Sequence, residues 1–198
     1  FLFDHGIVDI KEIDEITIET LSGIMKLKAY TSGGKVNRLR VDMGKAILEP
    51  KEIPVVLDGD KVVDRPVEIA GKNYNITCVS MGNPHCVVFM DDIDNLDIET
   101  IGPEFENDKL FPERVNTEFV TVLDDHTIKM RVWERGSGET WACGTGACAV
   151  AVAACENGFC KKGEDIKIKL KGGDLIINYT DETVYMTGNA EKVFEGEV

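Results

Sequence analysis

One stretch of small apolar residues constrains the fold more than any other feature of the chain. Residues 143–157 read C-G-T-G-A-C-A-V-A-V-A-A-C-E-N. Alanine favours helix, and Gly158 is a typical helix-ending residue, so we predict one helix over this range. The helix has almost no polar face and must therefore be buried on most sides. Its small side chains allow neighbouring strands to approach it closely.

Alternation of apolar and polar residues predicts that most of the remaining chain forms β-strands. The expected strands span residues 16–20, 25–30, 35–42, 67–80, 86–90, 116–123, 127–134, 165–170, 174–179 and 183–186. The strands at 116–123 and 127–134 should pair as a hairpin. The pattern predicts an α+β fold, in which an antiparallel sheet or open barrel curls around the buried central helix.

Other local signals complete this interpretation. A second, shorter helix is expected over 98–105, with Asp97 as its N-cap. Residues 135–140 read as a glycine-rich loop, and 188–198 as a candidate last strand. The first residues resemble the end of a helix that stops at Gly6.

Composition narrows the class of protein. With 36 acidic and 22 basic residues the formal charge is −14, which disfavours binding to nucleic acid. No apolar run approaches the roughly 20 residues of a membrane span, and the start does not resemble a signal peptide. We therefore expect a cytoplasmic protein with reduced thiols, no metal site and no cofactor. Its cysteines are Cys78, Cys86, Cys143, Cys148, Cys155 and Cys160, without a C-x-x-C pair.

Cys143 is the strongest candidate for chemistry. It precedes the predicted buried helix, where exposed N–H groups and the helix dipole favour negative charge and should lower the pKa of its thiol. Gly144, Thr145 and Gly146 allow a ligand close to backbone N–H groups, and a carboxylate would fit them. The alternative is that Cys143 is a small buried apolar residue, as cysteines often are.

Five motifs in fixed order carry a resemblance to a known family. Residues 133–149, W-E-R-G-S-G-E-T-W-A-C-G-T-G-A-C-A, resemble the second cysteine motif of the diaminopimelate epimerase family. M-G-N-P-H-C at 81–86, R-V-N-T-E-F-V at 114–120, M-T-G-N-A-E-K-V-F-E-G-E at 186–197 and V-D-M-G at 41–44 are similar to that family as well. The resemblance covers essentially the whole chain.

The resemblance implies two similar domains, each a sheet curled around a helix, with the active site in the cleft between them. Two cysteines face the substrate α-carbon from opposite sides, one as base and one as acid, without pyridoxal phosphate or metal. Inversion of a stereocentre needs this arrangement. Cys143 would be the second cysteine, Glu134 would polarise it and contact the amino group, and Gly144 and Thr145 would bind the α-carboxylate.

The resemblance also implies a distal part of the site. Arg135 would pair with the distal carboxylate of the substrate, Asn83 and Asn116 would hold its distal groups, and His85 would orient the opposite cysteine. Taken singly, each of these residues also has a purely structural explanation. Glu134 and Arg135 could be a solvated ion pair, and Asn83 could belong to a turn. Asn116 could cap a neighbouring element, and His85 could be a buried histidine with satisfied hydrogen bonds. Their joint occurrence in the order of the family favours the functional interpretation.

The chain departs from the family pattern in one respect. The motif of the other cysteine, C-G-N-G-like in the family, has no counterpart here, and the chain reads as beginning after it. We expect residues 1–44 to be a partial N-terminal domain to which the tail 186–198 returns, and 45–185 to be a complete C-terminal domain. The expected function is epimerisation of LL- to meso-diaminopimelate, with this chain impaired alone and completed by an N-terminal segment. A homodimer is compatible, because family members often pair.

Three alternatives remain open from the sequence. The first is a related proline racemase-like or phenazine-biosynthesis-like isomerase, although Arg135 and the two asparagines favour a substrate with two amino-acid ends. The second is a non-catalytic amino-acid-binding fragment, which thiol reactivity at Cys143 would distinguish. The third is a thiol hydrolase that uses Cys143 and His85, for which no third orienting group is evident.

Overall fold

The computed structural model describes residues 2–3, 5–7, 15–20 and 23–196, which form a mixed β-sheet with two α-helices. The helices are α1 (Ile98–Glu106) and α2 (Gly144–Glu156), with one short 3-10 turn, η1 (Pro50–Glu52). The strands are β1 (Ile16–Thr20), β2 (Gly23–Ser32), β3 (Lys35–Asp42), β4 (Arg65–Ile69), β5 (Lys72–Ser80), β6 (Pro84–Phe89), β7 (Asn116–Asp124), β8 (Thr127–Glu134), β9 (Gly138–Thr140), β10 (Asp165–Leu170), β11 (Gly173–Tyr179) and β12 (Val184–Asn189). No helix in these ranges is long and apolar enough to cross a membrane.

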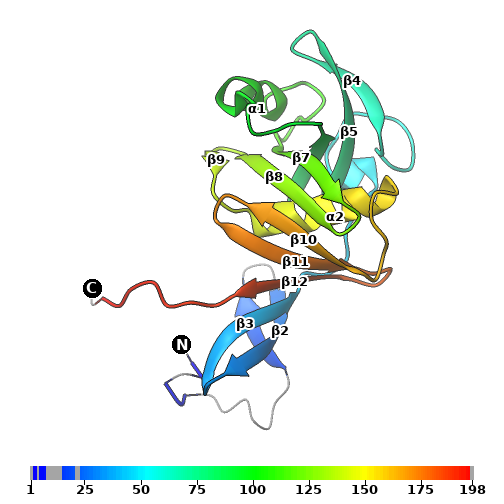
Figure 1. Cartoon of the computed structure of the whole chain (residues 1–198). Helices are drawn as coiled ribbons and strands as arrows, with labels where there is room; N and C mark the ends of the chain where they lie inside the picture. Colours follow the sequence, from blue (N-terminus) through cyan, green and yellow to red (C-terminus); the bar gives the residue numbers. More distant parts are fainter. Residues whose placement is uncertain (1, 4, 8–14, 21–22, 197–198) are drawn as a thin grey trace.

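The described strands join into one sheet (Figure 1). Its order is β1-β2-β3-β12-β11-β10-β8-β7-β6-β5-β4, with β9 paired to β8. The pairs β6–β7 and β8–β10 are parallel, so the expectation of a purely antiparallel sheet was wrong. A parallel pair needs a crossover connection of about a dozen residues or more. The segments that carry α1 and α2 supply the two crossovers.

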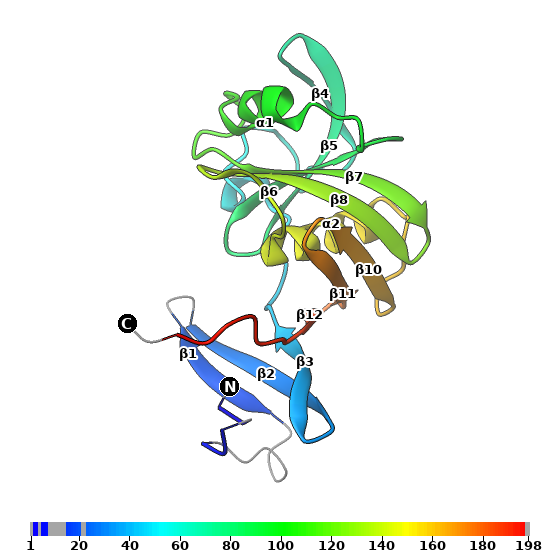
Figure 2. The ribbon, with the colours of Figure 1, turned by 60° about the vertical axis from the view of Figure 1, so that its left-hand side comes forward.

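Helix α2 forms as the sequence predicted, over Gly144–Glu156, with Cys143 as its N-cap and Asn157 as its C-cap. The nine consecutive residues from Gly146 to Ala154 are buried. They pack against strands β5, β6, β7, β10, β11 and β12, and Figure 2 shows β10 and β11 beside the helix. Alanine, glycine and valine make this close approach sterically feasible.

Helix α1 lies on the other face of the sheet, where it contacts β7, β8 and β9, and it also matches its prediction. The Asp97 side chain accepts a hydrogen bond from the Thr100 N–H at 3.3 Å, which caps its first turn. Alternation along β7 divides the two cores: Phe119 belongs to the cluster below α1, whereas Val120 belongs to the cluster around α2. The side chains of Asn116 and Glu118 share the parity of Val120, so they belong to the α2 face.

Some predicted boundaries were wrong for local reasons. The expected strand 67–80 is two strands, because Ala70 and Gly71 have φ values of 50° and 75° and form the two-residue loop between β4 and β5. The expected loop 135–140 contains the short strand β9. The predicted β7–β8 hairpin is confirmed. Part of the expected helix end at Gly6, residues 1 and 4, lies outside the described residues.

The last strand, β12, pairs with β3 near the N-terminal end of the chain. β12 pairs with β3 in antiparallel register from Tyr185↔Asp42 to Asn189↔Arg38, and the Ala190 N–H donates to the Asn37 carbonyl at 3.1 Å. In Figure 1 the sheet β1–β3 extends away from the two helices, and β12 joins it to the larger part.

A glycine in α1 provides a test of this packing. A Cβ at Gly102 would lie 2.3 Å from Cδ2 of Trp133, so Gly102→Ala must displace the indole ring. Overpacking costs about 1–3 kcal/mol, and a clash this short should exceed the ~1 kcal/mol that alanine gains in a helix. We expect a lower free energy of unfolding in urea titrations. Gly196→Ala is the matched control, because nothing lies within 4 Å of its Cβ position, and equal stability of both variants would contradict the packing.

Candidate functional site

Cys143 lies at the start of α2, where the sequence predicted it. Its backbone is extended (φ −137°, ψ 110°), and its sulfur accepts a hydrogen bond from the Gly146 N–H at 3.4 Å. The Thr145 Oγ1 lies 3.6 Å from the sulfur. The side chain is buried, with 7% exposure. The sulfur therefore takes the position that an Asp or Ser oxygen takes at an ordinary N-cap.

The expected lowered pKa of Cys143 is wrong for this structure. Burial first, then the carboxylate of Glu118 and to a smaller extent that of Glu134, together raise the pKa of the thiol to about 12. Contacts with Thr145 and Gly146 act in the opposite direction and are outweighed. The sequence reasoning accounted for the helix terminus but not for two carboxylates on neighbouring strands. Cys143 is thus a protonated thiol in this state.

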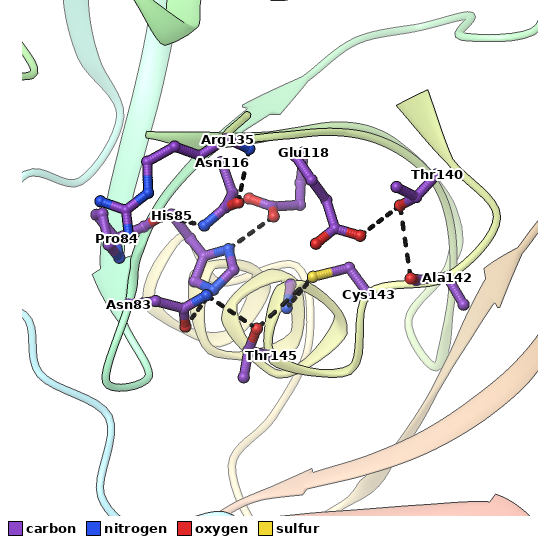
Figure 3. Close-up of polar contacts among 12 residues, drawn as sticks. Asn83, Pro84, His85, Asn116, Glu118, Arg135, Thr140, Ala142, Cys143 and Thr145 are labelled. Carbon is purple, nitrogen blue, oxygen red and sulfur yellow. Dashed lines mark hydrogen bonds and ion pairs between the residues drawn. The ribbon is translucent and has the colours of Figure 1, made fainter. Parts of the chain in front are cut away.

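A chain of polar contacts leads from Cys143 into the sheet (Figure 3). Thr145 accepts a hydrogen bond from the Asn83 side-chain N–H at 3.3 Å, and Asn83 Oδ1 lies 3.0 Å from Nε2 of His85. His85 Nδ1 lies 2.7 Å from Oε1 of Glu118. Three residues expected from the sequence, Asn83, His85 and Thr145, are therefore brought together with Cys143.

Asn116 and Arg135 lie on a second branch. The Asn116 side-chain N–H donates to the Pro84 carbonyl at 2.8 Å, and its Oδ1 accepts the Arg135 backbone N–H at 2.9 Å. The Arg135 guanidinium donates to the Glu113 carbonyl at 2.9 Å. Asn116 thus ties the residue that follows β8 to the first residue of β6 (Figure 3).

Glu134 is half-buried at the end of β8 and accepts a hydrogen bond from the Thr140 hydroxyl. Thr140 also contacts the carbonyl of Ala142, the residue before Cys143, at 3.5 Å. Glu134, which raises the pKa of Cys143, is therefore held against the segment that carries the cysteine.

Sequence reasoning missed Glu118, the most deeply buried charged group of this site. Both Glu118 and His85 have side-chain exposures of 0%. Burial raises the pKa of Glu118 while His85 lowers it. The residue lies inside the R-V-N-T-E-F-V motif, and the available signal was a charged residue within a strand whose neighbours are buried.

The turn that carries Glu134 and Arg135 depends on Glu106 of α1. Its carboxylate accepts hydrogen bonds from the Trp133 indole N–H at 2.7 Å, the Gly136 N–H at 2.9 Å and the Arg114 guanidinium at 3.0 Å. Gly136 has φ 80°, a conformation that favours glycine. Glu106 therefore fixes the β8–β9 turn from the opposite face of the sheet.

The six cysteines are free thiols. Among the described residues, no group of three or more His, Cys, Asp or Glu side chains is arranged to hold a metal ion.

Comparison with known proteins gives a consistent result. Residues 77–193 match the family model described as diaminopimelate epimerase. The chain is 51% identical to a diaminopimelate epimerase of Acetivibrio thermocellus over its whole length and 70% of that protein. It is 48% identical to a diaminopimelate epimerase of Agathobacter rectalis over 71% of that protein.

Solved structures show the same fold at low identity. A probable proline racemase from Agrobacterium radiobacter K84 superposes with a TM-score of 0.69 at 16% identity, over 95% of this chain. A hydroxyproline epimerase from Agrobacterium vitis gives 0.67 at 15% identity. The chain spans 61% and 60% of these two proteins, and at 16% and 15% identity they establish the fold alone.

Loss of the Glu106 carboxylate should loosen the β8–β9 turn. Glu106→Ala leaves the indole N–H of the half-buried Trp133 without its acceptor and also removes the hydrogen bond to the N–H of the exposed Gly136. Because an unsatisfied buried group costs about 1–3 kcal/mol, we expect the free energy of unfolding to fall by about that amount in urea titrations. Glu104→Ala, at an exposed position of the same helix, is the control and should change little. A loss no larger than the control would refute the anchoring role.

Alkylation should reveal the protonated state of Cys143. With a pKa of about 12, its thiolate fraction, and hence its rate with iodoacetamide, should rise about tenfold per pH unit from pH 7 to 10. Peptide mass spectrometry follows Cys143 separately from the other five cysteines. Free N-acetylcysteine, with a pKa of about 8.5, is the reference and levels off in this range. A Cys143 rate that levels off below pH 9 would contradict the prediction.

Proposed function

The chain belongs to the diaminopimelate epimerase family, and we propose that it provides one half of a two-base site that interconverts LL- and meso-diaminopimelate, an isomerase step of lysine biosynthesis. The observation that carries the proposal is the position of Cys143 at the start of α2 beside Glu134, His85 and Asn83, in a chain 51% identical to a family member. Cys143 is the proposed proton donor and acceptor on one face of the α-carbon.

The α-carboxylate is the group that the first turn of α2 suits. Backbone N–H groups of Gly144 and Thr145 belong to a helix start, where the dipole favours an anion. At Gly144 a Cβ would lie 3.1 Å from the sulfur of Met186, which limits this position to a very small residue. Carboxylate binding at a helix terminus also stabilises the negative charge that develops when the α-proton leaves.

The proposed roles of the distal residues follow from the second branch of contacts. Arg135 offers a planar guanidinium for the distal carboxylate. Asn83 and Asn116 would contribute amide groups to the distal end, and both are already held in place by backbone or side-chain contacts. Two charged ends on one substrate explain why an acidic protein would keep an arginine at this site.

The reaction needs the substrate to change the state of Cys143. In the free chain Cys143 is a thiol and is ready to donate a proton, but it is a poor base. A bound α-ammonium group beside Glu134 would offset the nearby carboxylate charge and favour the thiolate. The other cysteine of the two-base pair would act from the opposite face, because inversion requires an acid and a base on opposite sides.

The proposal includes the domain organisation expected from the sequence. Residues 1–44 with the tail would be part of a first domain, 45–185 a complete second domain whose sheet curls around α2, and an N-terminal segment would supply the second cysteine. Pairing of β12 with β3 and the burial of α2 support this division. In the described residues, the buried apolar core begins only at Ala46. The proposed binding partner is a small-molecule amino acid, and a homodimer is compatible with this domain organisation.

Exchange of the α-proton in deuterated water tests the function. The chain is incubated with LL- and meso-diaminopimelate, alone and with the N-terminal segment of the Acetivibrio thermocellus epimerase added. We expect exchange that depends on the added segment and falls about 100-fold or more in Cys143→Ala, the range for loss of a general base. Mass spectrometry of the recovered substrate measures it.

Two further outcomes decide between the alternatives. Cys148→Ala, on the same helix, is the control and should retain exchange, since that sulfur is buried within α2. Equal exchange rates for Cys143→Ala and the parent would refute the assignment of Cys143 as a catalytic residue. Exchange of proline in place of diaminopimelate would favour the racemase-like alternative.

A further inference from the structure

Glu118 occupies a position that the proposed function does not yet explain. It is fully buried on β7, on the sheet face that meets α2, and its Oε2 is one of three buried side-chain oxygens without a hydrogen-bond partner among the described residues. An unsatisfied buried carboxylate oxygen is costly and calls for a functional or structural reason.

The start of α2 is shaped around this carboxylate. A Cβ at Gly146 would lie 2.6 Å from Glu118 Oε1 and 3.1 Å from Cys143 Sγ. Both atoms therefore lie on the same side of Gly146, one from the sheet and one from the helix. Glycine at 146 is what allows the carboxylate and the sulfur to share this space.

The other carboxylate oxygen of Glu118, Oε1, contacts His85 and fixes the orientation of its ring. His85 Nε2 faces the Asn83 carbonyl oxygen, which only accepts, so in this arrangement Nε2 carries a hydrogen. Nδ1 then shares one proton with Glu118 Oε1 across 2.7 Å. Glu118 thus connects through His85, Asn83 and Thr145 to the sulfur of Cys143.

We propose that Glu118 is a positioning residue of the site, whose buried carboxylate orients His85 and keeps Cys143 as a thiol until an amino acid binds. The inference rests on the proposed function, which it deepens. The charge of Glu118 opposes a second negative charge at Cys143, and the ammonium of a bound amino acid offsets that opposition. The cysteine is then a base only when substrate is present.

Four other titratable groups interact electrostatically with Glu118 or Cys143. They are His85 on β6, Glu134 on β8, Cys148 on α2, and Cys86, which lies on the α1 face of β6. Of these, Glu134 also raises the pKa of Cys143, after Glu118. Glu118 is the larger of the two carboxylate effects, so its neutralisation is the sharper test.

The test is the pH dependence of Cys143 alkylation in Glu118→Gln. Glutamine keeps the shape and can still contact His85, but it removes the charge. We expect the iodoacetamide rate of Cys143 at pH 8 to rise roughly tenfold, the factor for one pKa unit. Glu118→Asp restores the charge and should return the rate toward that of the parent. An unchanged or slower rate in folded Glu118→Gln overturns the proposal.

A matched control separates this local effect from a general change in charge. Glu156→Gln makes the same substitution at the far end of α2, where the carboxylate pairs with Lys61 and Lys162, and it should leave Cys143 unchanged. If it accelerates Cys143 equally, the proposal is wrong. If Glu118→Gln does not fold, the double variant Glu118→Gln/His85→Gln replaces both members of the buried pair. The proposal then requires that Cys143 alkylates faster in this double variant than in the parent.

The readout is independent of the proposed activity. If α-proton exchange is absent but Glu118→Gln accelerates alkylation, the control of Cys143 stands and the epimerase function fails. If exchange occurs and Cys143 alkylates identically in parent and Glu118→Gln, the function stands and the role of Glu118 fails.

Discussion

The close contact between the start of α2 and one face of the sheet is the constraint on which the site depends. Gly146 lies where any larger side chain would meet Glu118 and Cys143 together. Because the buried residues beyond it in the helix, 147–154, are alanine, valine and cysteine only, α2 can lie close to strands β5, β6 and β7. The same close packing that builds the core therefore places a sulfur beside a buried carboxylate.

Alternation within the strands determines which residues reach this contact. On β6, His85 and Val87 belong to the α2 face, while Cys86 and Val88 belong to the cluster under α1. On β7 the same alternation directs Glu118 toward α2 and Phe119 toward α1. The parallel pairing of β6 and β7 puts His85 directly opposite Asn116. A shift of one residue in either strand would move the polar groups to the wrong core.

Much of this arrangement could be predicted from the sequence because it is local. Helix α2, the place of Cys143 at its start, the cap of α1 and the β7–β8 hairpin each depend on residues near one another in the chain. The parallel pairs could not be predicted in this way, since they depend on crossovers that bring distant segments together. The grouping of Asn83, His85 and Thr145 came from the family resemblance, and the contacts among them are a product of the tertiary fold.

The protonation of Cys143 shows why local reasoning was insufficient. A helix N-terminus alone favours a thiolate, and the Gly146 N–H does contact the sulfur as that argument requires. Burial and the two carboxylates act across the sheet and outweigh the helix, so the free chain holds a thiol. In the proposed reaction Cys143 must act both as an acid and as a base. The charge of a bound ammonium group would oppose the two carboxylates and shift Cys143 toward the thiolate.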